Sequence, residues 1–198
     1  MPASPPDDED RTAADVRVPR IVVTGSESTG KTTLAGWLAQ SLATIWVPEH
    51  SRAYAERVNR SLTASDVEPI ASGQLRDEEA GIAAWRARFA AQEAPPPLIL
   101  DTDLVSTTVY AEHYYGSCPA WIMSAARARL GDLYLLCATD VVWVADGVRD
   151  REDERAVLDA AFRARLRDVG ADVEEVSGSS PQRLAQALAA VDRWARGG

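Results

Sequence analysis

One short segment near the start of the chain has the residue types and spacing of a phosphate-binding loop. Residues 25–32 are Gly-Ser-Glu-Ser-Thr-Gly-Lys-Thr, which fits the pattern G-x-x-x-x-G-K-[ST] without a mismatch. Glycines let successive backbone amides point at phosphate oxygens, the lysine adds a positive charge, and the last hydroxyl is a ligand for Mg²⁺. The segment predicts binding of a nucleoside triphosphate with Mg²⁺. The residues expected to hold the nucleotide are Gly25, Glu27, Ser28, Thr29, Gly30, Lys31, Thr32 and Thr33.

A phosphoryl-transfer site also needs a carboxylate near its metal ion. Asp101 closes the apolar run 98–100, so a buried strand would place it at the edge of a sheet. We expect Asp101 and Thr32 to serve the metal, and Lys31 and Asp101 to act in catalysis. Asp103 follows two residues later, where it fits either the cap of the next helix or a substrate contact.

A second carboxylate, Glu49, follows the apolar run 45–47 and Pro48. Ligands of parallel sheets bind at such an edge, where a carboxylate can hold a substrate hydroxyl or accept its proton. Arg52 lies three residues later, on the same side of a helical turn. We expect Glu49 to be catalytic and Glu49 and Arg52 to contact substrate. A surface Glu–Arg pair is the alternative.

The segment 147–155 is dense in charge and contains arginines at positions 149, 151 and 155. Arginines on a mobile lid can close over a polyphosphate and stabilise the charge that develops during transfer. Composition alone favours a solvated charged loop.

Short apolar runs alternate with helical patterns along the rest of the chain. The runs that predict strands are 21–23, 45–47, 98–101 and 133–137, and a final strand is expected at 173–176. Helices are expected from residue 31, across most of 49–97 up to the prolines at 95–97, at 103–115, 119–130 and 157–166, and after Pro181. The run 141–144 fits either a strand or a segment lining a site. This alternation predicts an α/β fold with a parallel sheet of about five strands, covered by helices on both faces.

The composition excludes several classes of protein. The net charge of −9 argues against a nucleic-acid partner, which requires clustered positive charge. Two cysteines and two histidines are too few for a zinc cluster or a disulfide framework. The sequence has no apolar run long enough to span a membrane and no secretory signal at its start, so we expect a cytoplasmic protein without a membrane partner.

Several motifs occur together in a characteristic order. They are G-x-E-S-T-G-K-T-T-L at 25–34, P-E-x-x-R-x-Y at 48–54, I-A-x-G-Q at 70–74, L-D-T-D at 100–103 and W-V-x-D-G-x-R at 143–149. Together they resemble the ribosylnicotinamide kinase domain of NadR-type proteins, a P-loop kinase-like group. The similarity runs from about residue 20 to the end of the chain. It implies a P-loop kinase-like three-layer fold with a helical lid insertion.

The resemblance implies ATP-dependent phosphorylation of nicotinamide riboside to nicotinamide mononucleotide, a step of NAD salvage. It suggests that Lys31 and Thr32 contact phosphate and Mg²⁺, that Glu49 and Asp103 lie near the ribose, and that Arg149 belongs to the lid. It also favours a place for Trp143 in the site. The further residues expected to bind the acceptor lie in the 49–97 segment and are Arg52, Tyr54 and Gln74.

Two departures from the family pattern affect these expectations. Bifunctional members carry an adenylyltransferase domain ahead of the kinase, whereas only about twenty residues precede the first expected strand here. We therefore expect a disordered acidic leader over 1–19 and one P-loop kinase domain over 20–198, with 49–97 as a helical acceptor-binding insertion. Bifunctional members also have Trp-Glu-Tyr where this chain has Pro48-Glu49-His50. An aromatic residue suited to stack on the nicotinamide ring is missing there.

Two other functions fit the same loop. A deoxynucleoside or nucleotide kinase also uses a carboxylate after its second strand. A regulatory ATPase would instead couple hydrolysis to a change of shape for a protein partner. A small riboside or nucleoside remains the favoured partner, and the sequence says nothing of oligomeric state.

Overall fold

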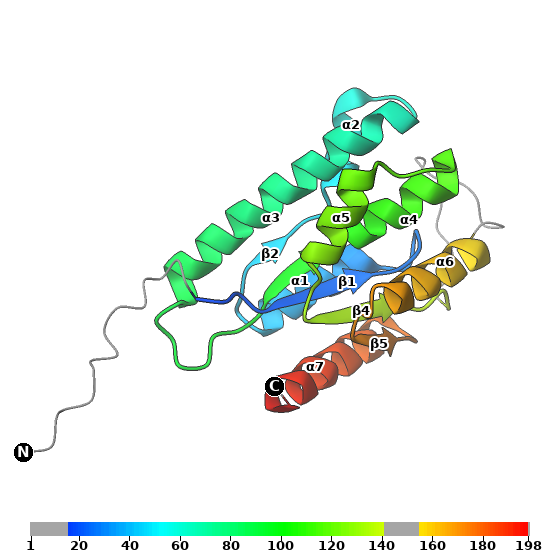
Figure 1. Ribbon diagram of the computed structural model, residues 1–198. Coiled ribbons are helices and arrows are strands. Elements are labelled where there is room, and N and C mark those ends of the chain that lie inside the picture. The colour runs from blue at the N-terminus through cyan, green and yellow to red at the C-terminus, as the bar shows by residue number, and fades with distance from the viewer. Residues whose placement is uncertain (1–15, 141–154, 198) are drawn as a thin grey trace, which may run out of the picture.

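A parallel sheet forms the centre of the computed structural model, which describes residues 16–140 and 155–197 (Figure 1). Five strands lie in the order β2-β3-β1-β4-β5, and every neighbouring pair is parallel. Runs that are apolar at successive positions form the central strands β1, β3 and β4, because both faces of the sheet are covered there. The strands are β1 (Arg20–Thr24), β2 (Trp46–Val47), β3 (Leu98–Asp101), β4 (Leu133–Cys137) and β5 (Val173–Val176).

Helices cover both faces of this sheet and make a three-layer α/β fold, which confirms the predicted fold class. The helix bounds are α1 (Lys31–Ser41), α2 (His50–Val58), the 3-10 turn η1 (Ala64–Asp66), α3 (Val67–Phe89), α4 (Leu104–Tyr115), α5 (Ala120–Ala128), α6 (Arg155–Asp168) and α7 (Ser180–Gly197). Helices α1 and α7 pack on one face, and α3, α4, α5 and α6 pack on the other. No helix of the described residues is both long enough and apolar enough to cross a membrane.

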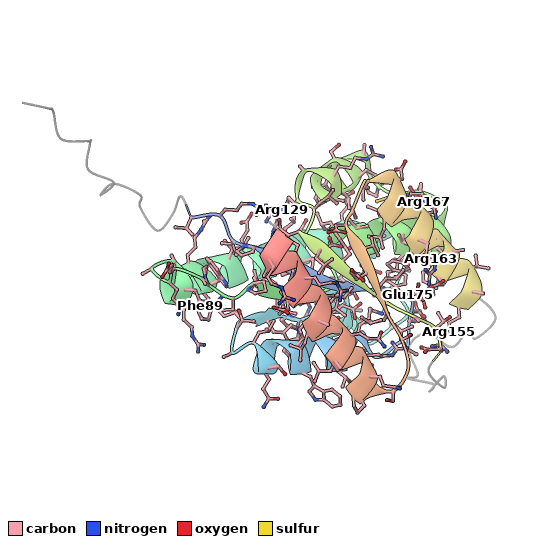
Figure 2. All side chains as sticks on the ribbon, turned by 90° about the horizontal axis from the view of Figure 1, so that it is seen from below. Phe89, Arg129, Arg155, Arg163, Arg167 and Glu175 are labelled. Carbon is pink, nitrogen blue, oxygen red and sulfur yellow. The ribbon has the colours of Figure 1, made fainter. Side chains whose placement is uncertain are left out.

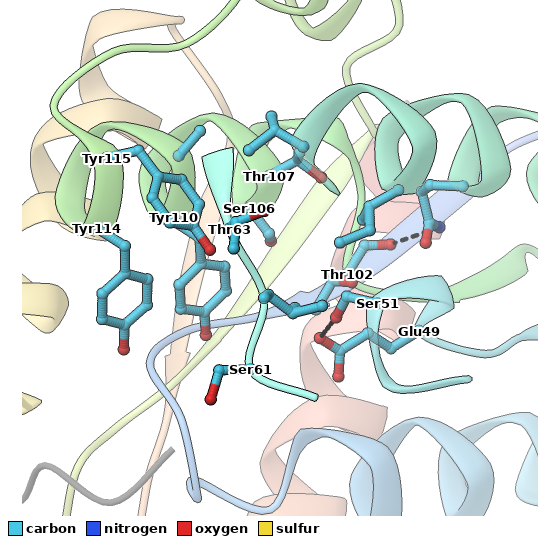
Figure 3. A pocket seen from close by; sticks show the side chains of 15 residues that line it. Glu49, Ser51, Ser61, Thr63, Thr102, Ser106, Thr107, Tyr110, Tyr114 and Tyr115 are labelled. Atoms are coloured by element: carbon cyan, nitrogen blue, oxygen red, sulfur yellow. Dashed lines mark hydrogen bonds between the residues drawn. The ribbon is translucent and has the colours of Figure 1, made fainter. Parts of the chain in front are cut away.

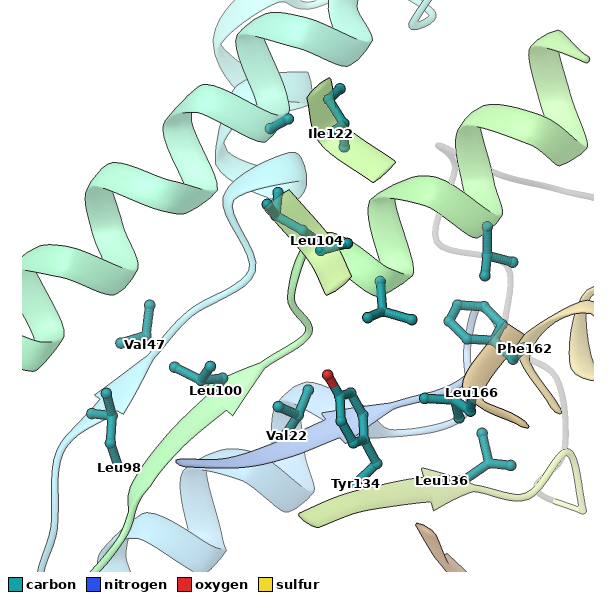
Figure 4. Packing of buried hydrophobic residues seen from close by; sticks show 14 of the residues in the cluster. Val22, Val47, Leu98, Leu100, Leu104, Ile122, Tyr134, Leu136, Phe162 and Leu166 are labelled. Carbon is teal, nitrogen blue, oxygen red and sulfur yellow. The ribbon is translucent and has the colours of Figure 1, made fainter. Parts of the chain in front are cut away.

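The alternation of side chains along β1 divides the core between the two faces. Val22 packs with Leu100, Tyr134 and Phe162 beneath the α3–α6 layer (Figure 4). Residues 21 and 23 point the other way, into the cluster formed with α1 and α7. Because successive side chains of a strand point to opposite faces, this alternation decides to which face the last residue of each strand points.

Charged residues mark the outer strand β5. Arg163 of α6 donates to Glu175 of β5 at 2.7 Å and to Asp159 one helical turn earlier at 2.7 Å (Figure 2). These bonds hold the carboxylate of Glu175, and its pKa lies below its usual range mainly because Arg163 hydrogen-bonds it. Charge on an outer strand also discourages pairing with another chain.

The helix predicted across most of 49–97 ends earlier than the prolines at 95–97 suggest. α3 stops at Phe89, and the chain then folds back so that the indole of Trp85 donates to the carbonyl of Pro96 at 2.7 Å. Trp85 is fully buried in the core. The reversal needed for this contact ends the helix before the prolines do.

The packed domain begins before Arg20. Val18 is only 7% exposed, and the carbonyl of Pro19 accepts a hydrogen bond from the amide of Leu98 at 2.8 Å. Residues 16–19, which the sequence assigned to the leader, therefore pack against the sheet. The expectations for 141–144, Trp143 and Arg149 fall outside the described residues.

Candidate functional site

The carboxyl ends of three neighbouring strands bring the predicted catalytic residues to one edge of the sheet. The phosphate-binding loop follows β1, Glu49 lies two residues beyond β2, and Asp101 ends β3. In the register of the sheet, Val23 pairs with Asp101 and Val47 pairs with Leu100. Parallel pairing thus places residues far apart in sequence around a common point.

The phosphate-binding loop has the backbone conformation that its glycines allow. Gly30 has φ of +80° and caps the start of α1, and Gly25 has φ of +129°. A Cβ atom at Gly25 would come within 2.9 Å of the carbonyl oxygen of Cys137, so this position has no room for a side chain. Thr29 Oγ1 and Lys31 Nζ donate to the carbonyl of Ser26, at 2.8 Å and 2.7 Å. The loop therefore curls around the Lys31 ammonium at the start of α1.

Asp101 is a buried carboxylate that the fold itself leaves without a hydrogen-bond partner. Both of its oxygens are inaccessible to solvent, and neither makes a hydrogen bond of good geometry with another described residue. Burial raises the pKa of Asp101 to about 6 and the Glu49 charge acts in the same direction, while the Thr32 hydroxyl and Lys31 oppose the rise. Such a group is stabilised by a cation or a proton.

The donor set at this point fits Mg²⁺ shared with a polyphosphate. Among the described residues no group of three or more His, Cys, Asp or Glu side chains could hold a metal ion alone. Mg²⁺ is commonly held by one or two protein oxygens together with substrate phosphates and water. The unpartnered oxygens of Asp101 and the nearby hydroxyl of Thr32 match that requirement.

A cavity of about 390 Å³ lies beside the loop, a size suited to a small ligand (Figure 3). Glu49 and Ser51 lie at one side of it, and Tyr110 and Tyr114 lie at the other. No lysine or arginine occurs among the described residues that line the cavity. Those residues are Glu49, Ser51, Ser61, Leu62, Thr63, Val67, Ile70, Gln74, Thr102, Ser106, Thr107, Tyr110, Ala111, Tyr114 and Tyr115.

Glu49 stands between the cavity and the metal-side carboxylate. It occupies the N-cap position of α2 with extended backbone angles, but its side chain makes no capping hydrogen bond. Its carboxylate accepts a hydrogen bond from the Ser51 hydroxyl and lines the cavity. It is close enough to Asp101 to raise the pKa of that group. The structure thus brings Glu49, Asp101 and Lys31 together. Arg52 is exposed and does not line the cavity, but its charge also lowers the pKa of Asp101.

Gln74 lines the cavity, but its amide also holds the surrounding backbone. Its Oε1 accepts from the amide of His50 at 3.1 Å, and its Nε2 donates to the carbonyl of Thr102 at 3.5 Å. The His50 ring fits because residue 73 is glycine, where a Cβ atom would lie 2.0 Å from His50 Nε2. The I-A-x-G-Q motif therefore positions the start of α2 next to Glu49.

Asp103 is the N-cap of α4. Its Oδ1 accepts from the amides of Val105 and Ser106 at 3.0 Å and 3.3 Å, and its Oδ2 accepts from the Tyr134 hydroxyl at 2.6 Å. Of the two roles that the sequence left open, the structure assigns the helix cap. Both oxygens of Asp103 are hydrogen-bonded inside the fold, and a contact with the substrate stays a prediction.

Tyr54 also differs from its expected place in the acceptor site. It does not line the cavity, and its hydroxyl donates to Asp66 at 2.9 Å. Asp66 further accepts from both terminal nitrogens of Arg60 and from the amide and hydroxyl of Thr63, at 2.7–2.9 Å. These bonds tie α2 to the loop 61–63, which lines the cavity, and a contact of Tyr54 with the acceptor stays a prediction.

The Asp66 carboxylate should make stability depend on pH. The hydrogen bonds from Arg60 hold the pKa of Asp66 well below its usual range, with further lowering by Thr63 and Tyr54. Asp66→Asn should therefore lower the free energy of unfolding at pH 7 by about 1–2 kcal/mol, because Arg60 is half exposed. The difference from wild type should persist down to about pH 5 and shrink as the pH falls below about 3.9. Urea unfolding between pH 7 and pH 3 measures it, and a difference independent of pH would contradict this role.

Sequence analysis missed the two tyrosines of α4 that face the cavity. Tyr110 and Tyr114 are one turn apart, and their rings are parallel, with 3° between the planes and 6.2 Å between the centroids. Their spacing of four residues was a signal of a shared helix face. Which face would meet the site depended on how α4 packs against the sheet.

A buried arginine behind the phosphate-binding loop was also missed. Arg183 of α7 is 3% exposed and donates to the carbonyls of Gly178, Thr29 and Ala138, each at 2.9 Å. It also pairs with the carboxylate of Asp140. One guanidinium thus joins the loops that follow β1, β4 and β5, because its planar fork carries five donors.

Removal of this guanidinium should destabilise the domain. Arg183→Met leaves three carbonyls and one carboxylate without their donors, so we expect a loss of about 3 kcal/mol in unfolding free energy. For a domain of this size the melting temperature should fall by about 6–12 °C. Arg193→Met is the matched control, because Arg193 lies on the same helix and pairs with Glu174 at the surface. Equal melting temperatures for the two variants would show that Arg183 is not a structural tie.

The fold and the loop define a P-loop nucleotide-binding protein. Residues 20–183 match a protein family described as AAA domain, and the chain belongs to that family.

Two curated relatives are the trifunctional NAD biosynthesis/regulator proteins NadR of Salmonella typhimurium and Escherichia coli. They are 29% identical to this chain over 133 and 135 residues, which is 65% of this chain but 30% of each relative's length. A solved structure of NadR protein in complex with NR has a TM-score of 0.71 at 24% identity, covering 90% of this chain and 52% of that one. Thymidylate kinase from Ehrlichia chaffeensis has a TM-score of 0.64 at 12% identity, covering 89% and 98%. These similarities confirm the P-loop kinase fold and the resemblance to NadR-type proteins.

Proposed function

We propose that this protein is an ATP-dependent kinase that phosphorylates nicotinamide riboside to nicotinamide mononucleotide. The cavity beside the phosphate-binding loop carries this proposal. It offers tyrosine rings, hydroxyl groups and one carboxylate, with no cationic side chain among its described residues. Aromatic faces suit a flat cationic ring such as pyridinium, hydroxyls suit a ribose, and a carboxylate suits the ribose hydroxyl that is phosphorylated. The curated NadR relatives and the NadR structure with NR agree with this acceptor.

In the proposed reaction, each catalytic residue has a separate task. Lys31 binds the β and γ phosphates, and Glu49 orients the acceptor hydroxyl and accepts its proton late in transfer. Thr32 and Asp101 would hold Mg²⁺, which supplies charge stabilisation of the transferred phosphoryl group when bound. The tyrosines and loop 61–63 keep the acceptor against Glu49 and limit the access of water.

The same cavity argues against a nucleoside monophosphate as acceptor. Thymidylate kinases share the fold, and a phosphorylated acceptor would need cationic groups to bind its phosphate. The charged side chain among the described residues that line the cavity is Glu49, and its charge would repel that phosphate.

A panel of acceptors tests the proposal. The protein is incubated with Mg·ATP and with nicotinamide riboside, common nucleosides, or nucleoside monophosphates, and products are identified by mass spectrometry. We expect nicotinamide mononucleotide to form, with kcat/KM at least about 100-fold above that of any monophosphate. A preference for a monophosphate would assign a nucleotide kinase. ADP formation without a phosphorylated acceptor would favour a regulatory ATPase.

Loss of the metal-side carboxylate should lower turnover without abolishing acceptor binding. Asp101→Asn preserves the shape of the side chain and removes its charge, so we expect turnover to fall about 10–100-fold and to require more Mg²⁺. Acceptor affinity in the absence of Mg²⁺ should stay near that of wild type. Titrating Mg²⁺ at saturating ATP measures the change, and an unaltered Mg²⁺ dependence would exclude a metal role for Asp101.

A further inference from the structure

Glu27 places a negative charge inside a loop that binds polyphosphate. Neighbouring like charges are unfavourable, so a carboxylate at this position needs a favourable partner. In the structure the hydroxyl of Tyr114 donates to Glu27 Oε1 at 2.7 Å. Sequence analysis assigned Glu27 to the nucleotide, but this contact joins it to a residue that lines the acceptor cavity.

The contact belongs to a larger junction between α4 and the loop. Tyr110 stacks on Tyr114 and directs its own hydroxyl to the carbonyl of Gly25 at 3.4 Å. Its other side meets the edge of the buried Phe162 ring, with 5.4 Å between the centroids. Both tyrosine hydroxyls therefore reach the phosphate-binding loop, while both residues line the cavity.

We propose that Glu27 is a positioning residue for the acceptor and that its hydrogen bond with Tyr114 couples the acceptor cavity to the phosphate-binding loop. The inference rests on the proposed function insofar as it takes this cavity as the acceptor site. A ligand that packs on the tyrosine rings then stabilises the Glu27 orientation that suits the polyphosphate. Each ligand should bind more tightly in the presence of the other, as coupling between two sites requires.

Nucleotide affinity in variants of Tyr114 and Glu27 separates this positioning role from a purely structural one. Tyr114→Phe keeps the ring but removes the hydroxyl that neutralises the Glu27 charge in part. The carboxylate then faces the phosphates more freely, so nucleotide affinity should fall about 10-fold. Glu27→Ala removes the carboxylate itself, so the Tyr114 hydroxyl then has no charge to orient. In the double variant the loss caused by Tyr114→Phe should therefore disappear.

Calorimetric titration with Mg²⁺ and a non-hydrolysable ATP analogue tests this with wild type, the two single variants and the double variant. Trp121→Phe is the matched control, because it deletes another donor bound to a carboxylate, that of Glu68, on an exposed side chain outside the cavity. We expect wild-type nucleotide affinity for this control. Wild-type affinity for Tyr114→Phe, or additive losses in the double variant, would overturn the proposal.

Acceptor binding gives a second readout. The affinity of wild type for nicotinamide riboside should rise about 5-fold or more when the ATP analogue is present, and this ratio should fall to about one in Tyr114→Phe and Glu27→Ala. Glu27→Gln retains an oxygen that accepts the Tyr114 hydroxyl, so it should keep most of the ratio. If wild type phosphorylates no riboside, the proposed function fails, whereas the nucleotide titrations above still decide the coupling.

Discussion

Replacing Glu49 by glutamine is expected to lower acceptor phosphorylation by about 10²–10⁴, the usual range for loss of a general base. The amide keeps the shape of the side chain and an oxygen for the Ser51 hydroxyl, so the cavity should stay intact. A ribose hydroxyl is a poor nucleophile near neutral pH, and Glu49 is the only carboxylate among the described residues that line the cavity. ATP hydrolysis without acceptor should change much less, because the phosphate-binding loop is untouched.

Both rates are measured on one preparation of Glu49→Gln, with product formation followed by mass spectrometry and ADP release by a coupled assay. Glu56→Gln, on the exposed side of α2, is the control. Mg²⁺ is titrated as well, because the Glu49 charge contributes to the raised pKa of Asp101. An equal fall in both rates would mean that Glu49 orients water, as in a regulatory ATPase. Unchanged rates would place the acceptor site elsewhere.

Lys31→Ala should remove almost all Mg·ATP turnover, with a loss of about 10²–10³-fold or more in rate. The lysine side chain lies over the phosphate-binding loop, where its ammonium donates to the Ser26 carbonyl, and it does not belong to either apolar cluster. The variant should therefore fold normally.

Thermal unfolding with and without Mg·ATP separates binding from folding. A nucleotide at 100 times its Kd should stabilise wild type by about 2.7 kcal/mol, and Lys31→Ala should gain far less. Gln40→Ala, on the exposed side of α1, should behave like wild type. Equal thermal shifts for wild type and Lys31→Ala would contradict the assignment of the loop.

The strands were predictable because local composition determines them. β3 and β4 begin and end where the sequence predicted, since both are continuous apolar runs with clear boundaries. The phosphate-binding loop was predictable for a similar reason, because its conformation depends on residues within one short segment. The end of α3 was not, because it depends on a contact between Trp85 and a carbonyl eleven residues away.

The acceptor cavity shows a stronger limit of sequence analysis. The local motif left two roles open for Asp103, and only the fold shows that the cap uses Oδ1 while the Tyr134 hydroxyl donates to Oδ2. Arg183 reaches three loops that follow different strands, so no spacing along the chain announces it. A role can be assigned to a residue whose partners are distant in sequence only when the fold is known.

The buried ammonium group of Lys31 has a practical consequence for chemical labelling. Lys31 is the only lysine in the chain, and the other twenty of its 21 lysine and arginine residues are arginines. Apart from the α-amino terminus, a reagent that acylates amines therefore has one target, and that target is the nucleotide site. Lys31 is 8% exposed and its ammonium donates to the Ser26 carbonyl, so acylation requires that the group leaves that carbonyl and loses a proton. Coupling of the protein to a surface through its amines will therefore use either the α-amino group or Lys31. Coupling through Lys31 blocks the phosphate-binding loop.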